Sequence, residues 1–141
     1  LHQKSGINES KVIEIHGTTR KVSCLACEYR EEMELILDRV RAGEEDPDCP
    51  SCGAILKSAT ISFGQALIPD DLHRAEMAVR RCDLLMAIGT SLAVGPINQV
   101  VPLANQLDIP IIIINGEKTD FDHFASLVIN ADISETLEVV C

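Results

Sequence analysis

The chain has 141 residues, of which 46% are hydrophobic, and its formal net charge is −10. That length fits one domain with a small satellite module, and the apolar content suffices for a core. The acidic charge argues against nucleic acid as a partner, because nucleic acid is bound by basic surfaces. No apolar run approaches the roughly 20 residues that a membrane span requires, and no secretory signal is visible. Since paired cysteines are typical of metal sites in reducing compartments, we expect a cytoplasmic protein.

The first region, residues 1–17, is expected to be a loop followed by a short extended segment. Residues 1–11 contain turn-forming residues, and residues 12–16 read as the extended piece, ending on His16 and Gly17. Such a position presents a side chain rather than burying it, and the glycine permits a tight turn. His16 is therefore a candidate reactive residue, although a histidine taken alone is more often structural.

Residues 18–57 contain two CxxC pairs and are expected to form a small zinc-binding module. Each pair places two thiolates on one turn, and two such turns complete a tetrahedron around one zinc ion. The set leaves no open coordination position, so the zinc should be structural. The alternative is that the pairs are reduced thiols by chance. The four candidate ligands are Cys24, Cys27, Cys49 and Cys52.

A helix is predicted over residues 30–43, between the cysteine pairs, and residues 44–48 read as an acidic, solvated turn. The rest of the chain, residues 58–141, is expected to form an α/β Rossmann-like parallel sheet with helices on both faces, because its strands are apolar throughout and alternate with helices. The expected strands cover 57–63, 83–88, 109–114 and 126–130, and the expected helices cover 96–107, 121–125 and 133–140, with another starting at Pro69.

Polar residues follow two of these strands. Gly89, Thr90 and Ser91 come after the strand 83–88, and Asn115 and Glu117 come after the strand 109–114. In an open α/β sheet the crevice at the carboxyl ends of the strands holds the ligand, and acidic groups there can bind ribose hydroxyls. By itself each turn is weak evidence, since Asn115 can simply begin a turn. The two together predict a nucleotide site.

In combination and in this order, the motifs resemble the sirtuin family. The matching segments are Leu-His-Gln-Lys-Ser-Gly at 1–6, Glu-Ile-His-Gly at 14–17, the two CxxC pairs, Ile-Ser-Phe-Gly-Gln at 61–65, Gly-Thr-Ser-Leu-Ala-Val-Gly-Pro at 89–96 and Ile-Asn-Gly-Glu at 114–117.

The resemblance implies an NAD-dependent protein-lysine deacylase, which transfers the acyl group to ADP-ribose and releases nicotinamide. His16 would be the general base, and an acyl-lysine peptide would be the substrate. NAD and one structural zinc would be the cofactors. The residues implied in cofactor binding are Gly89, Thr90, Ser91, Asn115, Glu117 and Ile133, and those implied in peptide binding are Ile61, Phe63, Gly64, Gln65 and Val94.

Some positions depart from the family pattern. Gln65 replaces the usual glutamate and Ile68 interrupts the usual Leu-Pro, which puts substrate preference in question. The family's Gly-Ala-Gly phosphate loop has no counterpart in these residues, so we expect them to be inactive on their own. The alternatives are a non-catalytic module that binds acylated or basic peptides, an ADP-ribosyltransferase and a nucleotide-binding domain of the thiamine-enzyme type. The sequence does not indicate an oligomeric state.

Overall fold

A computed structural model of the chain describes residues 2–140, so Leu1 of the first motif and Cys141 lie outside the described residues. The chain divides into two compact units, Leu1–Ile68 and Pro69–Cys141. None of the helices in the described part is both long and apolar enough to cross a membrane.

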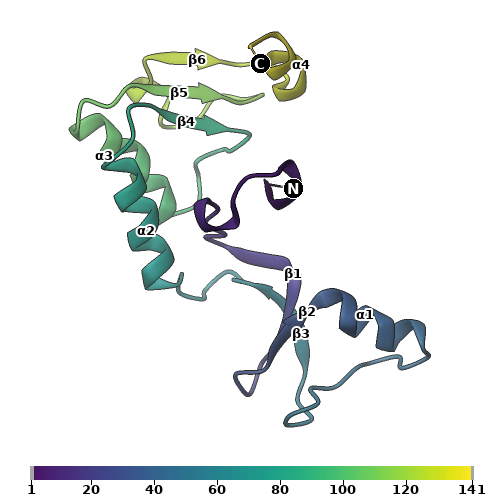
Figure 1. The fold of residues 1–141 in the computed structure, drawn as a ribbon. Helices are drawn as coiled ribbons and strands as arrows, with labels where there is room; N and C mark the ends of the chain where they lie inside the picture. Colours follow the sequence, from purple (N-terminus) through teal and green to yellow (C-terminus); the bar gives the residue numbers. More distant parts are fainter. Residues whose placement is uncertain (1, 141) are drawn as a thin grey trace. The chain divides into compact units, whose positions relative to one another are not determined.

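The first unit is built on an antiparallel sheet in the order β2-β1-β3 (Figure 1). The strands are β1 (Gly17–Cys24), β2 (Arg30–Glu32) and β3 (Leu56–Thr60), and Val22 of β1 lies opposite both Glu31 and Ser58. Helix α1 (Met33–Arg41) follows β2, and two short 3₁₀ turns, η1 (His2–Ser5) and η2 (Glu9–Lys11), precede β1. The buried residues of this unit are few: Val22, Ile36, Cys49, Ala59 and Thr18.

Three sequence predictions need correction in this unit. Residues 12–16 do not form an extended segment up to His16, because the N–H of Gly17 donates to the carbonyl of Glu14 at 2.7 Å and closes a turn there. The predicted helix 30–43 begins only at Met33, since Arg30–Glu32 pair with β1. The strand predicted over 57–63 ends at Thr60, because Ser62 and Gln65 form a hydrogen-bonded turn. Residues 1–11, expected as a loop, contain the two 3₁₀ turns.

The second unit contains a parallel sheet, as the sequence predicted, and its strand order is β4-β5-β6. The strand predicted over 57–63 was expected in this sheet, but β3 pairs antiparallel with β1 in the first unit instead. Its strands are β4 (Leu85–Ile88), β5 (Ile111–Ile114) and β6 (Leu127–Ile129), with Ile113 opposite both Ala87 and Val128. Each strand is shorter than predicted. The other elements are α2 (Pro69–Val79), η3 (Ile97–Gln99), α3 (Val100–Gln106), η4 (Asp122–Phe124) and α4 (Ile133–Val140).

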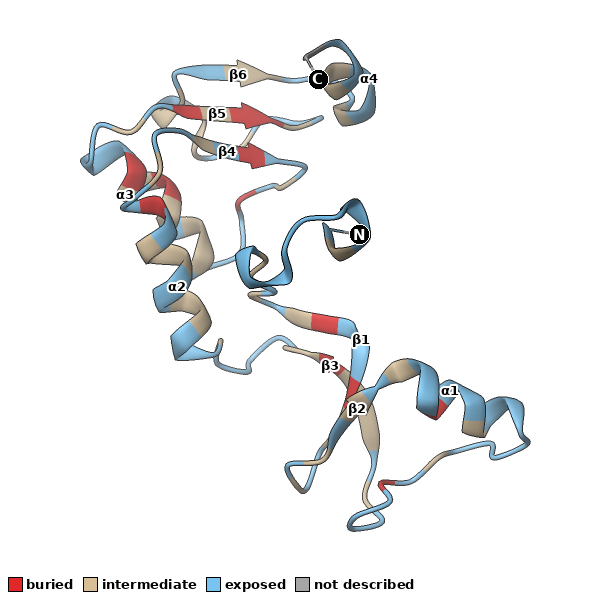
Figure 2. Cartoon of the chain, viewed as in Figure 1, coloured by how far each residue is buried: buried red, intermediate tan, exposed pale blue. Residues whose placement is uncertain are grey.

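The core of this unit lies between β5 and α3, where the buried residues gather (Figure 2). Ile111 and Ile113 of β5 pack with Val101 and Ala104 of α3, and all four are almost completely inaccessible to solvent. Each such aliphatic side chain contributes roughly 1.5–3 kcal/mol on burial, somewhat less for alanine. The central strand is thus held firmly, and the loops at its carboxyl end have a rigid base.

Gly17 is a position where the fold requires glycine. Its φ is +74°, and a Cβ built there would lie 2.2 Å from the carbonyl oxygen of Ala59 on β3. Gly43 also has a positive φ of +102°, but nothing lies within 4 Å of a Cβ at that position. We expect Gly17→Ala to lower the free energy of unfolding by about 3 kcal/mol, from left-handed backbone strain plus the clash, and Gly43→Ala by only about 1 kcal/mol.

Urea unfolding of the metal-loaded protein would measure both values. Equal losses of unfolding free energy in the two variants would show that the close contact between Gly17 and β3 does not require glycine.

Candidate functional site

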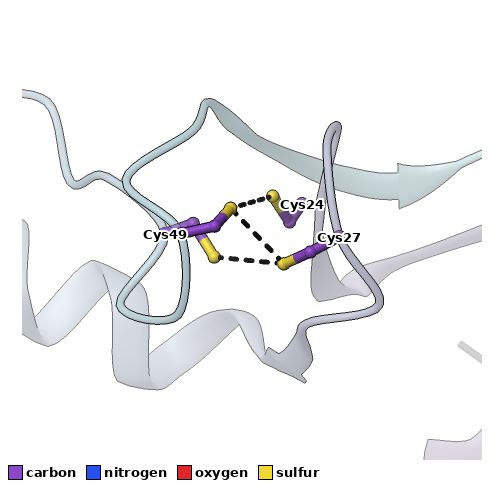
Figure 3. A group of neighbouring side chains, drawn as sticks. Cys24, Cys27 and Cys49 are labelled. Carbon is purple, nitrogen blue, oxygen red and sulfur yellow. Dashed lines mark hydrogen bonds between the residues drawn. The ribbon is translucent and has the colours of Figure 1, made fainter.

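Four cysteines of the first unit converge from two turns to form a cage (Figure 3). All four Sγ atoms lie within 4.8 Å of one another. The Sγ atoms of Cys24 and Cys52 are 3.5 Å apart, those of Cys27 and Cys52 are 3.5 Å apart, and those of Cys27 and Cys49 are 3.7 Å apart. Four thiolates at about 2.3 Å from a tetrahedral zinc ion would be separated by about 3.8 Å. The donor set and its spacing therefore fit zinc, as the sequence predicted.

Backbone hydrogen bonds shape each turn of the cage. In the first turn, the N–H of Cys24 donates to the carbonyl of Tyr29 at 3.0 Å, and the N–H of Ala26 donates to the Cys24 Sγ at 3.3 Å. In the second turn, the N–H of Cys49 donates to the carbonyl of Ala54 at 2.9 Å, and the N–H of Gly53 donates to the carbonyl of Cys49 at 2.8 Å. Both turns are therefore closed by main-chain hydrogen bonds.

The electrostatics of the cage favour a bound cation. The N–H of Ala26 lowers the pKa of Cys24 to about 6. The pKa of Cys52 is raised to about 12: the N–H of Ala54 acts in the opposite direction, but the sulfurs of Cys27 and Cys24, together with desolvation, outweigh it. Thiols this close cannot all ionise together without a compensating positive charge. A divalent metal supplies that charge and is itself bound by thiolates.

His16 lies in the turn just before β1, and its side chain is exposed. Its carbonyl accepts a hydrogen bond from the N–H of Ile61 at 2.9 Å, which extends the contact between the ends of β1 and β3. His16, the predicted general base, thus lies beside Ile61, the first residue of the predicted peptide-binding segment. Within that segment Phe63 is 95% exposed, and Gly64 and Gln65 are exposed as well.

In the second unit, residues of the predicted nucleotide site gather at the carboxyl ends of the parallel strands. The N–H of Gly89, after β4, donates to Ile114 at 2.9 Å, and the N–H of Asn115, after β5, donates to Ile129 at 3.1 Å. A Cβ at Gly89, whose φ is +64°, would lie 2.8 Å from the Cδ1 of Ile133. Gly89, Asn115 and Ile133 therefore lie close together.

Hydroxyl and amide groups order the loops around this edge. The Thr90 and Ser91 hydroxyls accept hydrogen bonds from the N–H groups of Leu92 and Ala93, at 3.2 and 3.4 Å. The amide of Asn98 donates to the carbonyl of Leu92 at 3.0 Å and holds this loop in place.

On the neighbouring strand end, the Asn115 amide donates to the carbonyl of Glu117 at 2.9 Å. The Asn130 amide donates to the carbonyls of both Asn115 and Glu117 at 3.3 Å. Sequence reasoning missed Asn98 and Asn130. Asn98 lies in η3 and Asn130 directly follows β6, and an asparagine at such a position is too common in turns to stand out in a sequence.

The predicted site residues fall into two groups, one in each unit. His16, the cysteines and residues 61–65 lie in the first unit, whereas Val94 and the nucleotide residues lie in the second. Within the first unit the four cysteines converge and His16 contacts Ile61, and within the second unit Gly89, Asn115 and Ile133 lie close together.

Comparison with known proteins points to a single family. The family model described as the Sir2 family matches residues 1–96. The chain is 39% identical over 137 residues to NAD-dependent protein deacetylase 2 of Streptomyces coelicolor, covering 97% of this chain and 57% of the relative. It is 40% identical over 137 residues to NAD-dependent protein deacetylase of Rhodopseudomonas palustris, covering 97% of this chain and 54% of that relative. The chain thus spans little more than half the length of these relatives.

Solved structures agree in fold. A Sir2 protein bound to a p53 peptide and NAD+ has a TM-score of 0.89 and 29% identity, with 99% of this chain and 57% of the other covered. Sir2Tm bound to a propionylated peptide has a TM-score of 0.90 and 29% identity, with 99% and 58% covered.

The cage can be tested by its metal content. We expect one zinc ion per purified chain, and we expect Cys49→Ser to lose it and to lower the thermal midpoint, because three thiolates do not complete the tetrahedral site and metal binding is coupled to folding. Elemental analysis with a thermal melt would measure both. Cys82→Ser is the control, since the Cys82 Sγ donates to the Val79 carbonyl at 3.2 Å in the second unit. Full zinc content in the Cys49 variant would contradict the assignment.

Proposed function

The chain belongs to the Sir2 family, and from this premise we propose that it is part of an NAD-dependent protein-lysine deacylase. The observation that carries the proposal is the backbone hydrogen bond from Ile61 to His16, at 2.9 Å. It puts an exposed histidine beside the segment that resembles the family's peptide-binding strand. Relatives named NAD-dependent protein deacetylase, 39% and 40% identical to this chain, support the same reaction.

His16 is proposed as the general base. NAD, when bound, supplies the acyl acceptor, since its nicotinamide is released and its ADP-ribose moiety receives the acyl group. The His16 imidazole would take the proton from the ribose hydroxyl that attacks the acyl group. Histidine suits a proton transfer near neutral pH, and the side chain is exposed at the end of a turn rather than packed in a core.

The carboxyl ends of β4, β5 and β6 are proposed to hold part of the NAD molecule. Thr90 and Ser91 accept hydrogen bonds from loop N–H groups, so each hydroxyl still has its own proton to donate to a phosphate or ribose oxygen. Asn115 and Glu117 would hold the adenosine ribose, and Ile133 would lie near the adenine. Gly89 supports this arrangement because a side chain at this position would clash with Ile133, so only glycine lets the backbone of the loop lie this close to Ile133.

The substrate is proposed to be an acyl-lysine peptide that adds as a strand. Main-chain groups of an extended segment supply the affinity in such binding. The residues of the first unit proposed to bind the peptide are Ile61, Phe63, Gly64 and Gln65. In the second unit the proposed peptide-binding residue is Val94. The exposure of Phe63 supports a surface that a partner covers. Sir2 structures with p53 and propionylated peptides bound support the class of substrate.

The zinc is proposed to be structural, because four cysteine ligands leave no position for water or substrate. We also propose a cytoplasmic location, since four cysteines held for a metal must stay reduced.

The role of His16 can be tested in the whole protein with NAD and an acetyl-lysine peptide. We expect His16→Ala to reduce release of the deacetylated peptide by at least about 100-fold, the usual contribution of a general base, and to leave peptide binding unchanged. Mass spectrometry would follow the deacetylated peptide and nicotinamide, and fluorescence polarisation would follow binding of the acetyl-lysine peptide. His73→Ala is the matched control, because His73 is an exposed histidine on α2.

Turnover of the His16 variant within twofold of wild type would remove the general-base role. Nicotinamide release by the wild type without deacetylation would indicate ADP-ribosyl transfer or a different acyl group.

The nucleotide site can be tested separately. We expect Asn115→Ala to raise the KM for NAD by about tenfold, since a buried hydrogen bond to a ligand is lost, and to leave the KM for peptide unchanged. Asn105→Ala is the control, because Asn105 is exposed near the end of α3, which leads to the amino end of β5. Equal KM values for NAD in the two variants would place the nucleotide elsewhere.

A further inference from the structure

The side chain of Arg39, on α1, contacts the loop that leads to the second cysteine pair. Its Nε donates to Oε2 of Glu44 at 2.7 Å, and its Nη2 donates to Oε1 of the same carboxylate at 2.6 Å. Its Nη1 donates to the carbonyl of Asp48 at 3.0 Å. One guanidinium therefore holds both ends of residues 44–48, and Asp48 is bonded directly to the ligand Cys49.

The geometry of these contacts is more restrictive than that of an ordinary surface ion pair. A two-bond contact between guanidinium and carboxylate fixes both the distance and the plane of the pair. The main chain adds a further bond, from the N–H of Glu44 to the carbonyl of Arg39 at 3.1 Å. The hydrogen bonds and charge of Arg39 hold the pKa of Glu44 below its usual value, so the pair stays ionised through neutral pH.

Charge makes this contact important for the neighbouring cage. The loop carries four carboxylates, Glu44, Glu45, Asp46 and Asp48, and it leads to a group of four cysteines that binds metal as thiolates. Like charges repel, and that repulsion favours movement of the loop away from the cage. The Arg39 guanidinium opposes this movement by neutralising Glu44 and by binding the Asp48 carbonyl.

Arg41 lies two residues along the same helix and shows the contrast. Its guanidinium contacts Glu34 at 2.7 Å and Asp38 at 2.6 Å, and both of these carboxylates belong to α1. Its side chain is 58% exposed, against 31% for Arg39. Arg41 thus has two ion pairs that stay on the helix, whereas Arg39 connects the helix to the metal-binding loop.

We propose that Arg39 is a positioning residue for the zinc site, which holds Cys49 at the distance from the other thiolates that the metal requires. The proposal rests on the zinc assignment and is independent of the deacylase reaction. A zinc ion leaves when one ligand detaches and does not return, so the retention of the metal depends on how firmly the loop before Cys49 is held. Arg39 slows this detachment without touching the metal.

The test measures the rate of zinc transfer from the whole, zinc-loaded protein to an excess of a chelating dye at neutral pH. We expect Arg39→Met to release zinc at least about tenfold faster than wild type, because it loses several charge-assisted hydrogen bonds. Arg39→Lys should restore part of the retention, since an ammonium group keeps the charge but cannot make the two-bond contact. Arg41→Met should stay within about twofold of wild type, because exposed pairs contribute little.

Glu44→Gln supplies a second, independent variant that keeps α1 unchanged. It should also release zinc faster, and the double variant Arg39→Met/Glu44→Gln should be no faster than Arg39→Met alone, since the two residues act through one contact. Equal zinc release from the Arg39→Met and Arg41→Met variants would overturn the proposal, as would additive effects in the double variant. Wild-type protein without zinc would overturn the metal site and this proposal with it, and would leave the assay of His16 as a separate question.

Discussion

The antiparallel pairing of β1 with β3 is the interaction on which the first unit depends. β1 begins directly after His16 and ends on Cys24, while β3 begins four residues after Cys52 and ends one residue before Ile61. The register joins Gly17 to Thr60 at one end and Cys24 to Leu56 at the other. One pair of strands therefore has the cysteine cage at one end and the contact between His16 and Ile61 at the other.

This arrangement separates the cysteine cage from His16. β3 pairs with β1 at both ends and spans four residue steps of about 3.3 Å, so the two ends of the strand pair lie on the order of 13 Å apart. A zinc ion in the cage would thus be too far from His16 to contact its side chain. Its effect is exerted through the strands, because the cage joins the end of β1 to the residues that lead into β3.

The first unit relies on such local constraints because its core is small. Few of its side chains are buried, and apolar residues of α1 and of the cysteine turns, such as Leu35, Leu25 and Ile55, remain exposed. A unit of this size does not gain enough from hydrophobic burial alone, so metal ligation commonly supplies the remainder. The close approach of Gly17 to Ala59 and the contacts of Arg39 act in the same sense, since each restricts a strand or loop that the core does not hold.

The second unit reaches its stability by a different route. β5 is a run of isoleucines buried among β4, β6 and α3, so its ends are fixed by packing. The polar residues that follow β4 and β5 are then ordered by hydrogen bonds within their own loops and by those from Asn98 and Asn130. A rigid apolar strand with polar groups at its carboxyl end is the usual basis of nucleotide sites in α/β folds.

Features that depend on local spacing can be predicted from the sequence. The two CxxC pairs each place two sulfurs on one turn, the isoleucine run 111–114 indicates a buried parallel strand, and Pro69 with the acids after it begins α2. Features that depend on distant partners became clear only from the folded chain. Arg30–Glu32 form a strand because β1 lies beside them, and Gly89 has no room for a side chain because Ile133 occupies the space. Likewise Arg39 meets Asp48 only because α1 folds back on its own loop. Hydrogen-bonded pairing and steric contact between residues far apart in sequence leave no periodic pattern, and so local reasoning cannot predict them.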